Sequence, residues 1–438
     1  MEIALMMFPA LLVLIFLGIP VAYSLMGISL VFGIMRFGDK AVFQFVTKVQ
    51  DVAGNYVLAA LPLFIFMGAM LEKSGIAERL FEAIHMWTRR LPGGLAVGSI
   101  LMGVVFAAAS GVVGATETVI GLLAIPIMMS HSYDKRLISG TICAGGSLGT
   151  IIPPSVLVII LAPVADVSVG DLFAGIMFPG SIMAGLFILY VLVICTIDPS
   201  RAPFKAQDGP LPTMGERIVK TLFALVPPLI LIFVVLGTIL LGWATATEAA
   251  ACGAIGAVLL TAIYGNCSVR TVATALRQTM LITAMVLTIL LAGNMFAGVF
   301  IASGGLGATN NILAAAELGP WATLTLILFI TFIAGFILDL VSVILIVIPI
   351  AIPIIKIAGF DPVWFCILFL VMLQTSYLTP PMAPSIFYLR GISPPEIKLR
   401  HMYWGVIPFI VMQLLTLALV LAFPQLALWL PSQLLGGF

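Results

Sequence analysis

The sequence predicts an all-α polytopic membrane protein with about ten membrane crossings, two re-entrant helical hairpins and inverted-topology repeats. Three observations predict this fold. Apolar residues make up 62% of the 438 residues and charged residues 8%, too few charges for the surface of a soluble domain of this size. Apolar runs of about 15 to 25 residues recur along the whole chain, as expected of membrane-spanning helices. The third observation is an internal repeat.

The two halves of the chain match at special residues separated by a nearly constant offset. Proline and aspartate mark particular backbone positions, so their matches do not follow from an apolar composition. The clearest matches, each 227 residues apart, are Pro126 with Pro353, Asp134 with Asp361, and Pro153-Pro154 with Pro380-Pro381. We therefore expect a first repeat over residues 1–197, a cytoplasmic linker over 198–218 and a second repeat over 219–438.

Each repeat is expected to contain the same series of elements. Two spans come first, followed by an amphipathic stretch, a third span and a second amphipathic arm. A long apolar stretch, a helix broken by Pro-Pro and a final span complete the repeat. The first three spans are expected at 3–17, 21–36 and 57–71 in the first repeat, and at 219–243, 244–264 and 280–302 in the second.

Two apolar stretches, residues 94–129 and 321–356, are too long for one tilted helix and have polar centres. We expect each to form a hairpin of two half-helices that meet at a polar tip and return to the side from which they came. Non-helical backbone at that depth requires a cover of protein or water. A broken helix is expected after each hairpin, over 137–165 and 363–390.

The distribution of positive charge supports this arrangement. With an external N-terminus, ten crossings and two hairpins, fifteen of the 19 Lys and Arg residues face the cytoplasm. Only Arg36, Lys40, Lys48 and Lys356 face outward. Five crossings per repeat is an odd number, so the repeats are inverted and both termini lie outside. The first hairpin then opens to the cytoplasm and the second to the outside.

Inverted repeats with broken helices are typical of secondary transporters, whose sites lie near the membrane midplane. Carbonyls freed at a helix break, together with hydroxyls, suit a sodium ion, and helix N-termini after the Pro pairs suit a carboxylate. The candidate sodium-binding residues are Ser110, Gly111, Gly114, Thr116, Ser147, Gly149, Thr150, Gly335, Asp339, Ser342, Thr375, Ser376 and Thr379. The candidate substrate-binding residues are Glu117, Pro153, Pro154, Ser155, Pro380 and Pro381. An isolated Pro-Pro pair would indicate an ordinary helix kink, but its recurrence in both repeats favours a site.

Glu117 and Asp339 are the acidic residues expected deepest in the membrane, where acids are usually functional. The alternative is a neutral, hydrogen-bonded carboxyl group beside a watery crevice. Glu248 follows Thr245 and is expected to cap a helix. No Lys or Arg is expected at the midplane, so an anionic solute would depend on helix dipoles, hydroxyls and sodium charge.

Several other functions find no support in the sequence. There is no P-loop, no basic patch for nucleic acid and no set of residues arranged for nucleophilic catalysis. The five cysteines form no CxxC, and the three histidines have no metal-ligand spacing, so no transition-metal site is expected. The first apolar segment has no charged n-region before it and is expected to be a retained span.

The motifs together resemble the large membrane subunit of the tripartite ATP-independent periplasmic (TRAP) transporters, the DctM-like family, over nearly the whole chain. They are Gly18-Ile19-Pro20-Val21-Ala22, Leu61-Pro62-Leu63-Phe64, Leu91-Pro92-Gly93-Gly94-Leu95, the tip at 110–118, Ile151-Ile152-Pro153-Pro154-Ser155, Thr247-Glu248-Ala249-Ala250-Ala251, Gly359-Phe360-Asp361-Pro362 and Thr379-Pro380-Pro381. The sequence departs from the family pattern at the first tip and at Ala383, where the family usually has glycine.

The resemblance implies a sodium-driven elevator-type ion-transporter fold in a bacterial inner membrane, with both termini periplasmic. Hairpins and broken helices would form the moving domain, and the other spans and arms the scaffold. It also implies three partners: a small four-helix membrane subunit (DctQ-like), a periplasmic substrate-binding protein (DctP-like) and a small organic anion. Na⁺ would be the coupling ion, with no further cofactor.

Three alternatives remain open. A stand-alone sodium-coupled dicarboxylate or anion carrier of a related inverted-repeat fold would differ in not depending on a binding protein. A membrane-embedded enzyme lacks a visible catalytic constellation in the sequence. A channel would not show saturable, ion-coupled uptake.

Overall fold

All regular structure is helical in the part of the chain that the computed structural model describes, residues 2–111, 114–203, 213–380 and 383–434. Of the residues singled out above, Pro381 lies outside the described residues, as do Val112 and Val113 at the first predicted tip.

The first half of the chain supplies α1 to α10. In order, they are α1 (Glu2–Phe16), α2 (Val21–Phe37), α3 (Lys40–Ala53), α4 (Ala60–Lys73), α5 (Ile76–Thr88), α6 (Gly94–Ser110), α7 (Ala115–Ser130), α8 (Lys135–Ser147), α9 (Val156–Ala165) and α10 (Val169–Ile197). Short 3-10 turns are η1 (Tyr56–Ala59), η2 (Leu148–Thr150) and η3 (Pro199–Arg201).

The second half supplies α11 to α20. In order, they are α11 (Met214–Leu240), α12 (Ala246–Ile263), α13 (Val269–Ala302), α14 (Gly305–Ala315), α15 (Pro320–Ala334), α16 (Leu340–Ile357), α17 (Pro362–Leu378), α18 (Pro384–Ile392), α19 (Leu399–Ala422) and α20 (Gln425–Leu434).

The repeated aspartates begin corresponding helices. The Asp134 carboxylate accepts from the Arg136 amide at 3.1 Å before α8, and the Asp361 carboxylate accepts from the Trp364 amide at 2.9 Å before α17. Both are N-caps, which satisfy amides that the first turn of a helix leaves without a partner. The two aspartates therefore match at the repeat offset because each caps the start of a broken helix.

The third spans of the two halves differ in one respect. In the first half, Gly54 and Asn55 separate the arm α3 from α4, and the Asn55 side chain accepts from the Val57 amide at 3.0 Å. In the second half, the arm and the span predicted at 280–302 form one continuous 34-residue helix, α13. The corresponding sequence around residues 281–283 is Leu-Ile-Thr, with neither glycine nor asparagine to end a helix.

Helix contacts are exchanged between the halves. The helix α4 packs on α12, and their counterparts at the repeat offset, α13 and α2, also pack together. In the same way α7 contacts α18 while α16 contacts α9, and α8 contacts α19 while α17 contacts α10. Each contact between a helix of the first half and a helix of the second therefore recurs between their counterparts. A two-fold relation between the halves produces this pattern.

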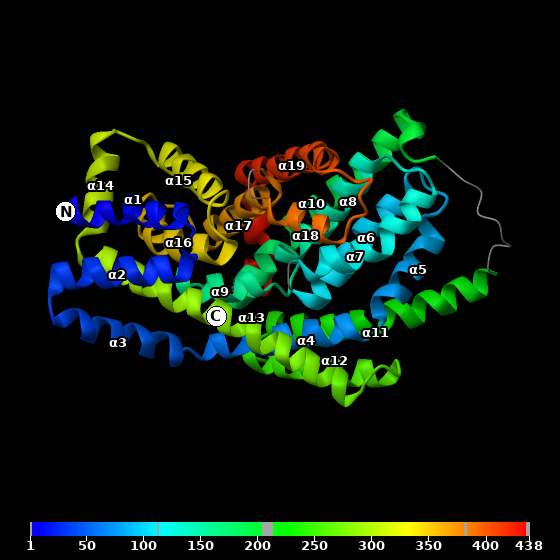
Figure 1. Ribbon diagram of the computed structural model, residues 1–438, viewed down its shortest axis with the longest axis horizontal. Coiled ribbons are helices and arrows are strands. Elements are labelled where there is room, and N and C mark those ends of the chain that lie inside the picture. The colour runs from blue at the N-terminus through cyan, green and yellow to red at the C-terminus, as the bar shows by residue number, and fades with distance from the viewer. Residues whose placement is uncertain (1, 112–113, 204–212, 381–382, 435–438) are drawn as a thin grey trace.

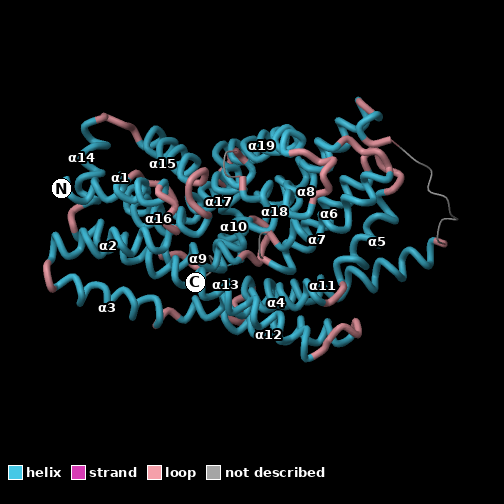
Figure 2. The backbone as a smooth tube through the Cα atoms, viewed as in Figure 1, coloured by secondary structure: helices cyan, strands magenta, loops and turns pink. Residues whose placement is uncertain are grey.

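Two groups of helices lie side by side in Figures 1 and 2. The helices α4, α11, α12 and α13 run together along the lower side. The pair α6–α7 and the pair α15–α16 lie above them, toward opposite ends of the long axis, with α10, α17 and α19 between. A large apolar core joins the two groups, and a second cluster forms where α1 and α2 pack on α13.

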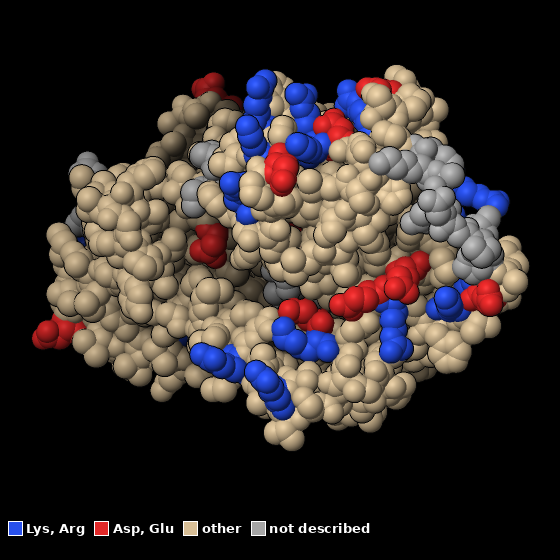
Figure 3. Space-filling model, turned by 45° about the vertical axis from the view of Figure 1, so that its right-hand side comes forward, with Lys and Arg blue, Asp and Glu red and all other residues tan. Residues whose placement is uncertain are grey.

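Seven helices among the described residues are long and apolar enough to cross a membrane: η1 with α4, α10, α11, α12, α13, α16 and α19. Shorter apolar helices of 10–17 residues include α6, α9, α15 and α17. The number of ten crossings stays a prediction. Each of these short helices would have to combine with another helix to cross a bilayer, so their lengths do not fix the number of crossings. On the face shown in Figure 3, most of the surface carries no charge, and charged side chains gather along its upper edge and in a lower band.

Candidate functional site

The first pair of short helices meets the first helix break. The helix α6 ends at Ser110, and Gly111 follows with φ of 61°. The Val156 amide, at the start of α9, donates to the Gly111 carbonyl at 3.4 Å. A Cβ atom at position 111 would lie 2.8 Å from the Pro154 carbonyl oxygen. Glycine therefore permits both the left-handed turn and the close approach of tip to break.

The second pair meets the second break in a corresponding way. A Cβ atom at Gly335, where α15 ends, would overlap the Ser376 hydroxyl near the end of α17. Asp339 begins α16, and its carboxylate accepts from the Ser342 amide at 3.1 Å and from the Ser342 hydroxyl. Asp339, which was expected deep in the membrane, is exposed at the surface of the protein.

Hydroxyl groups line both breaks, and each donates a hydrogen bond to a backbone carbonyl. The donors reach a carbonyl three to five residues earlier at 2.7–3.1 Å; they are Ser147, Thr150, Ser155, Thr375, Ser376 and Thr379. A hydroxyl oxygen has one donor and two lone pairs, so these oxygens keep acceptor capacity for a cation. Of the other predicted site residues, Gly149 lies in η2. Thr116, Pro153 and Pro154 are buried, whereas Pro380 is half-buried.

The two breaks touch each other through a residue that the prediction did not assign to the site. The Gln374 side chain on α17 donates through Nε2 to the Ser147 carbonyl at the end of α8, at 2.5 Å. These two positions are 227 residues apart, the repeat offset. Two positions related by a two-fold rotation contact each other only close to its axis. The spacing alone was a signal that could have identified Gln374.

Glu117 lies fully buried behind the first tip, in the first turn of α7. Its carboxylate accepts from the Gly114 amide at 2.6 Å, which closes the start of the helix. The side chains of Tyr377 on α17 and Ser385 on α18 lie near this carboxylate, whose other oxygen has no hydrogen-bond partner among the described residues. On the third side, a Cβ atom at Gly146 of α8 would overlap the Glu117 side chain.

The second half of the chain therefore holds the tip of the first. A Cβ atom at Gly114 would lie 2.7 Å from the Tyr388 ring of α18, so the tip packs directly on this tyrosine. Tyr377, Ser385 and Tyr388, which lie near this tip, were missed from sequence because they are more than 250 residues away from Glu117 along the chain. Glu117 is the one charged side chain in the buried part of the described residues, and no Lys or Arg is buried there.

Ala383 stands between the second Pro pair and α18 with φ of 35°. This left-handed conformation costs an L-residue about 1–2 kcal/mol and is free for glycine. The departure from the glycine expected at this position thus falls where backbone geometry favours glycine. The helix α18 begins directly afterwards at Pro384, as α9 begins after Ser155 in the first half.

This bundle of apolar helices, with a largely uncharged surface and two broken helices, is that of an integral membrane protein. The chain belongs to the family described as the DctM component of the tripartite ATP-independent periplasmic transporter, whose family model matches residues 8–426. The resemblance stated from the sequence is therefore confirmed.

Several large permease proteins are similar over nearly their full length. The chain is 28% identical to the C4-dicarboxylate TRAP transporter large permease protein DctM of Pseudomonas aeruginosa, covering 93% of this chain and 94% of that protein. It is 27% identical to the sialic acid TRAP transporter large permease protein SiaM of Vibrio cholerae, over 97% of both. It is 29% identical to the ectoine TRAP transporter large permease protein TeaC of Halomonas elongata, over 95% and 96%. These relatives are transporter subunits rather than enzymes.

Among solved structures, the Alcanivorax borkumensis YdaH transporter has the same fold. The TM-score is 0.62 at 18% sequence identity, and the match covers 95% of this chain and 99% of that one. At this identity the likeness concerns fold alone.

Proposed function

We propose that this chain is a large permease subunit that uses a sodium gradient to take up a small organic acid, delivered by a periplasmic binding protein. The observation that carries the proposal is the meeting of each tip with the break of its own half, Gly111 with Pro154 and Gly335 with Ser376. Around both meeting points, hydroxyl groups donate their hydrogen to backbone carbonyls, so their oxygens keep lone pairs that can bind sodium. The relatives are named for C4-dicarboxylates, sialic acid and ectoine, which supports an organic acid here.

The proposed mechanism is an elevator. The pairs α6–α7 and α15–α16 and the broken helices α8–α9 and α17–α18 would move as one body, because they contact one another within and between the halves. The helices α4, α11, α12 and α13 would form the scaffold, completed by a small four-helix membrane subunit. The inverted repeat that this mechanism requires is supported by the exchanged helix contacts and by the Gln374–Ser147 bond.

The sodium part of the proposal is tested by Thr150→Val and Thr379→Val. Valine keeps the shape of threonine and removes the oxygen, so we expect a higher sodium concentration for half-maximal uptake, by about tenfold for the loss of roughly 1.4 kcal/mol. The matched control is Thr288→Val on α13, whose hydroxyl makes the same kind of bond, to the Ala284 carbonyl at 2.7 Å. Uptake into proteoliposomes is measured against sodium concentration. Sodium dependence unchanged in both site variants would exclude these hydroxyls as ligands.

A further inference from the structure

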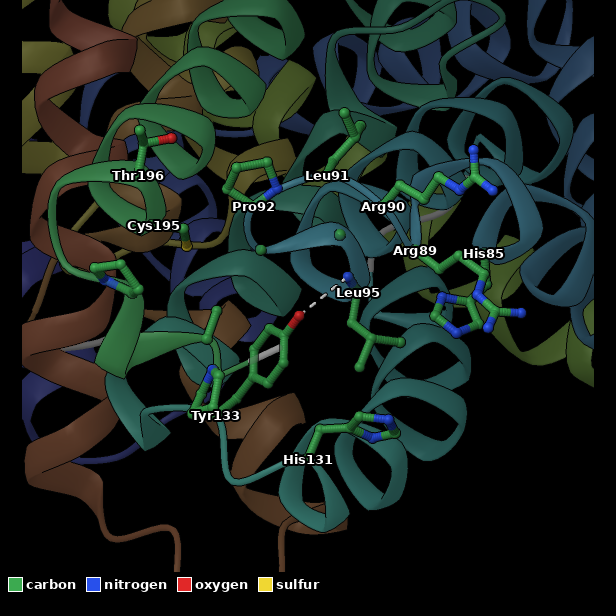
Figure 4. A pocket seen from close by; sticks show the side chains of 15 residues that line it. His85, Arg89, Arg90, Leu91, Pro92, Leu95, His131, Tyr133, Cys195 and Thr196 are labelled. Carbon is green, nitrogen blue, oxygen red and sulfur yellow. Dashed lines mark hydrogen bonds between the residues drawn. The ribbon is translucent and has the colours of Figure 1, made fainter. Parts of the chain in front are cut away.

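A cavity of about 350 Å³ lies where α5 ends and α6 begins, away from the tips and breaks. Four basic side chains line it, His85, Arg89, Arg90 and His131. Figure 4 shows His85, Arg89 and His131 on one side of the cavity and Cys195 and Thr196 of α10 on the other, with Arg90 further out. Its walls thus come from three separate stretches of the chain.

The start of α6 forms part of this wall and is held rigidly. Gly93 has φ of 66°, and a Cβ atom there would lie 2.6 Å from the Cys195 sulfur, so the loop packs tightly on α10. The Leu95 amide donates to the Tyr133 hydroxyl at 3.4 Å. The N-terminus of this 17-residue helix therefore directs its positive dipole end at the same cavity as the arginines.

Among the described residues, no carboxylate lines the cavity to balance this charge. The nearest acid along the α10 wall, Asp198, accepts from the Ser200 hydroxyl and from Arg201 Nε at 3.0 Å. These bonds hold the pKa of Asp198 below its usual range, so it is fully engaged as an anion. Among the described residues, neither Arg89 nor Arg90 has a carboxylate within salt-bridge distance.

We propose that this cavity binds a phosphate group, either as inorganic phosphate or as the headgroup phosphate of a lipid. The planar fork of an arginine matches phosphate oxygens, and the positive dipole end of α6 favours an anion. The His131 Nδ1–H group donates to the Ile127 carbonyl at 2.9 Å, which fixes the ring at the edge of the cavity. Arginines at a membrane surface commonly attract anionic lipids, and here protein walls from three stretches of the chain also shape the position. The volume also leaves room for the remainder of a phosphate ester.

Thermal unfolding of the full chain, purified in detergent and stripped of lipid, tests the proposal with inorganic phosphate as the probe. We expect phosphate to raise Tm relative to sodium chloride at equal ionic strength, because a ligand that binds the folded state stabilises it. Arg89→Gln should weaken the apparent Kd for phosphate at least tenfold. The control Arg136→Gln removes the same charge from an exposed residue outside the cavity and should keep the wild-type shift.

A second arm identifies the source of the phosphate. Native mass spectrometry of the chain released from nanodiscs of phosphatidylcholine and phosphatidylglycerol should show one retained phospholipid fewer in Arg89→Gln if a lipid headgroup is bound. A Tm shift in the lipid-free protein together with unchanged lipid retention in Arg89→Gln indicates free phosphate. The proposal is overturned if Arg89→Gln matches the wild type in both measurements. If Arg89→Gln does not fold, Arg90→Gln is judged by the same criteria.

Discussion

At the scale of single residues, Glu117 shows how this chain keeps a carboxylate fully buried. The Gly114 amide donates to one oxygen, and the side chains of Tyr377 on α17 and Ser385 on α18 lie near the group. These contacts make Glu117 a link between the first tip and the second half of the chain. We therefore expect its main contribution to come through the position of the tip.

Glutamine at position 117 can still accept from the Gly114 amide, whereas alanine leaves that amide without a partner at a cost of about 1–3 kcal/mol. We expect Glu117→Gln to retain uptake within about threefold and Glu117→Ala to lose stability and uptake together. Uptake and thermal unfolding of both variants provide the measurements. A Glu117→Gln protein that folds normally yet transports nothing would show that the charge itself takes part in transport.

Residue-level prediction succeeded where the interaction is local. The predicted cap is confirmed at Glu248, whose carboxylate accepts from the Thr245 amide at 2.8 Å. This cap could be predicted because its two partners are only three positions apart in the sequence. Gln374 could not be placed in the same way, since its partner Ser147 lies in the other half of the chain. Only the repeat offset connects such positions.

At the scale of helices, α8 and α19 approach each other closely through two glycines. A Cβ atom at Gly140 would overlap the Gly405 carbonyl, and one at Gly405 would overlap the Arg136 carbonyl. Small residues permit this kind of contact between apolar helices. The sequence predicted the helices from their apolar length, but their pairing depends on surface shape, which periodicity does not show.

Alanine at either glycine must push the two backbones apart. We expect Gly140→Ala and Gly405→Ala each to lower the free energy of unfolding by about 1–3 kcal/mol, the usual cost of overpacking. The matched control is Gly185→Ala on α10, where an added Cβ meets nothing within 4 Å. Thermal unfolding in detergent compares the three. Equal stabilities for all three variants would mean that the α8–α19 contact is looser than described.

At the scale of the whole molecule, α10 separates two ends. Its 29 residues span about 43 Å, enough to cross a bilayer. Asp171 at its start lies in electrostatic range of Asp361, whereas the Arg201 carbonyl beyond its end accepts from the Asp134 amide at 2.8 Å. The two repeated aspartates thus lie at opposite ends of the helix, as a pair of inverted repeats requires.

We expect a thiol at position 361 and at both termini to be labelled from outside, and thiols at 134 and 206 from the cytoplasm. Position 206 lies outside the described residues, and its assignment depends on the charge distribution alone. Membrane-impermeant maleimide is applied to variants with one added cysteine, made after the exposed Cys252 and Cys267 are replaced by serine; Cys143, Cys195 and Cys366 are buried. Labelling of positions 134 and 206 from outside would refute the inverted topology.

The central claim is that this chain is a permease subunit that depends on delivery of its solute. No Lys or Arg is buried among the described residues, so the proposed site would bind an organic acid without a fixed cation of its own. Such a site gains from a receptor that raises the local solute concentration.

Uptake into proteoliposomes under an inward sodium gradient tests this claim most directly. The chain alone is compared with the chain reconstituted with its small membrane subunit and the loaded binding protein. We predict no appreciable uptake by the chain alone, and sodium-dependent uptake when both partners are added. Robust uptake by the chain alone would contradict the account and identify a stand-alone carrier.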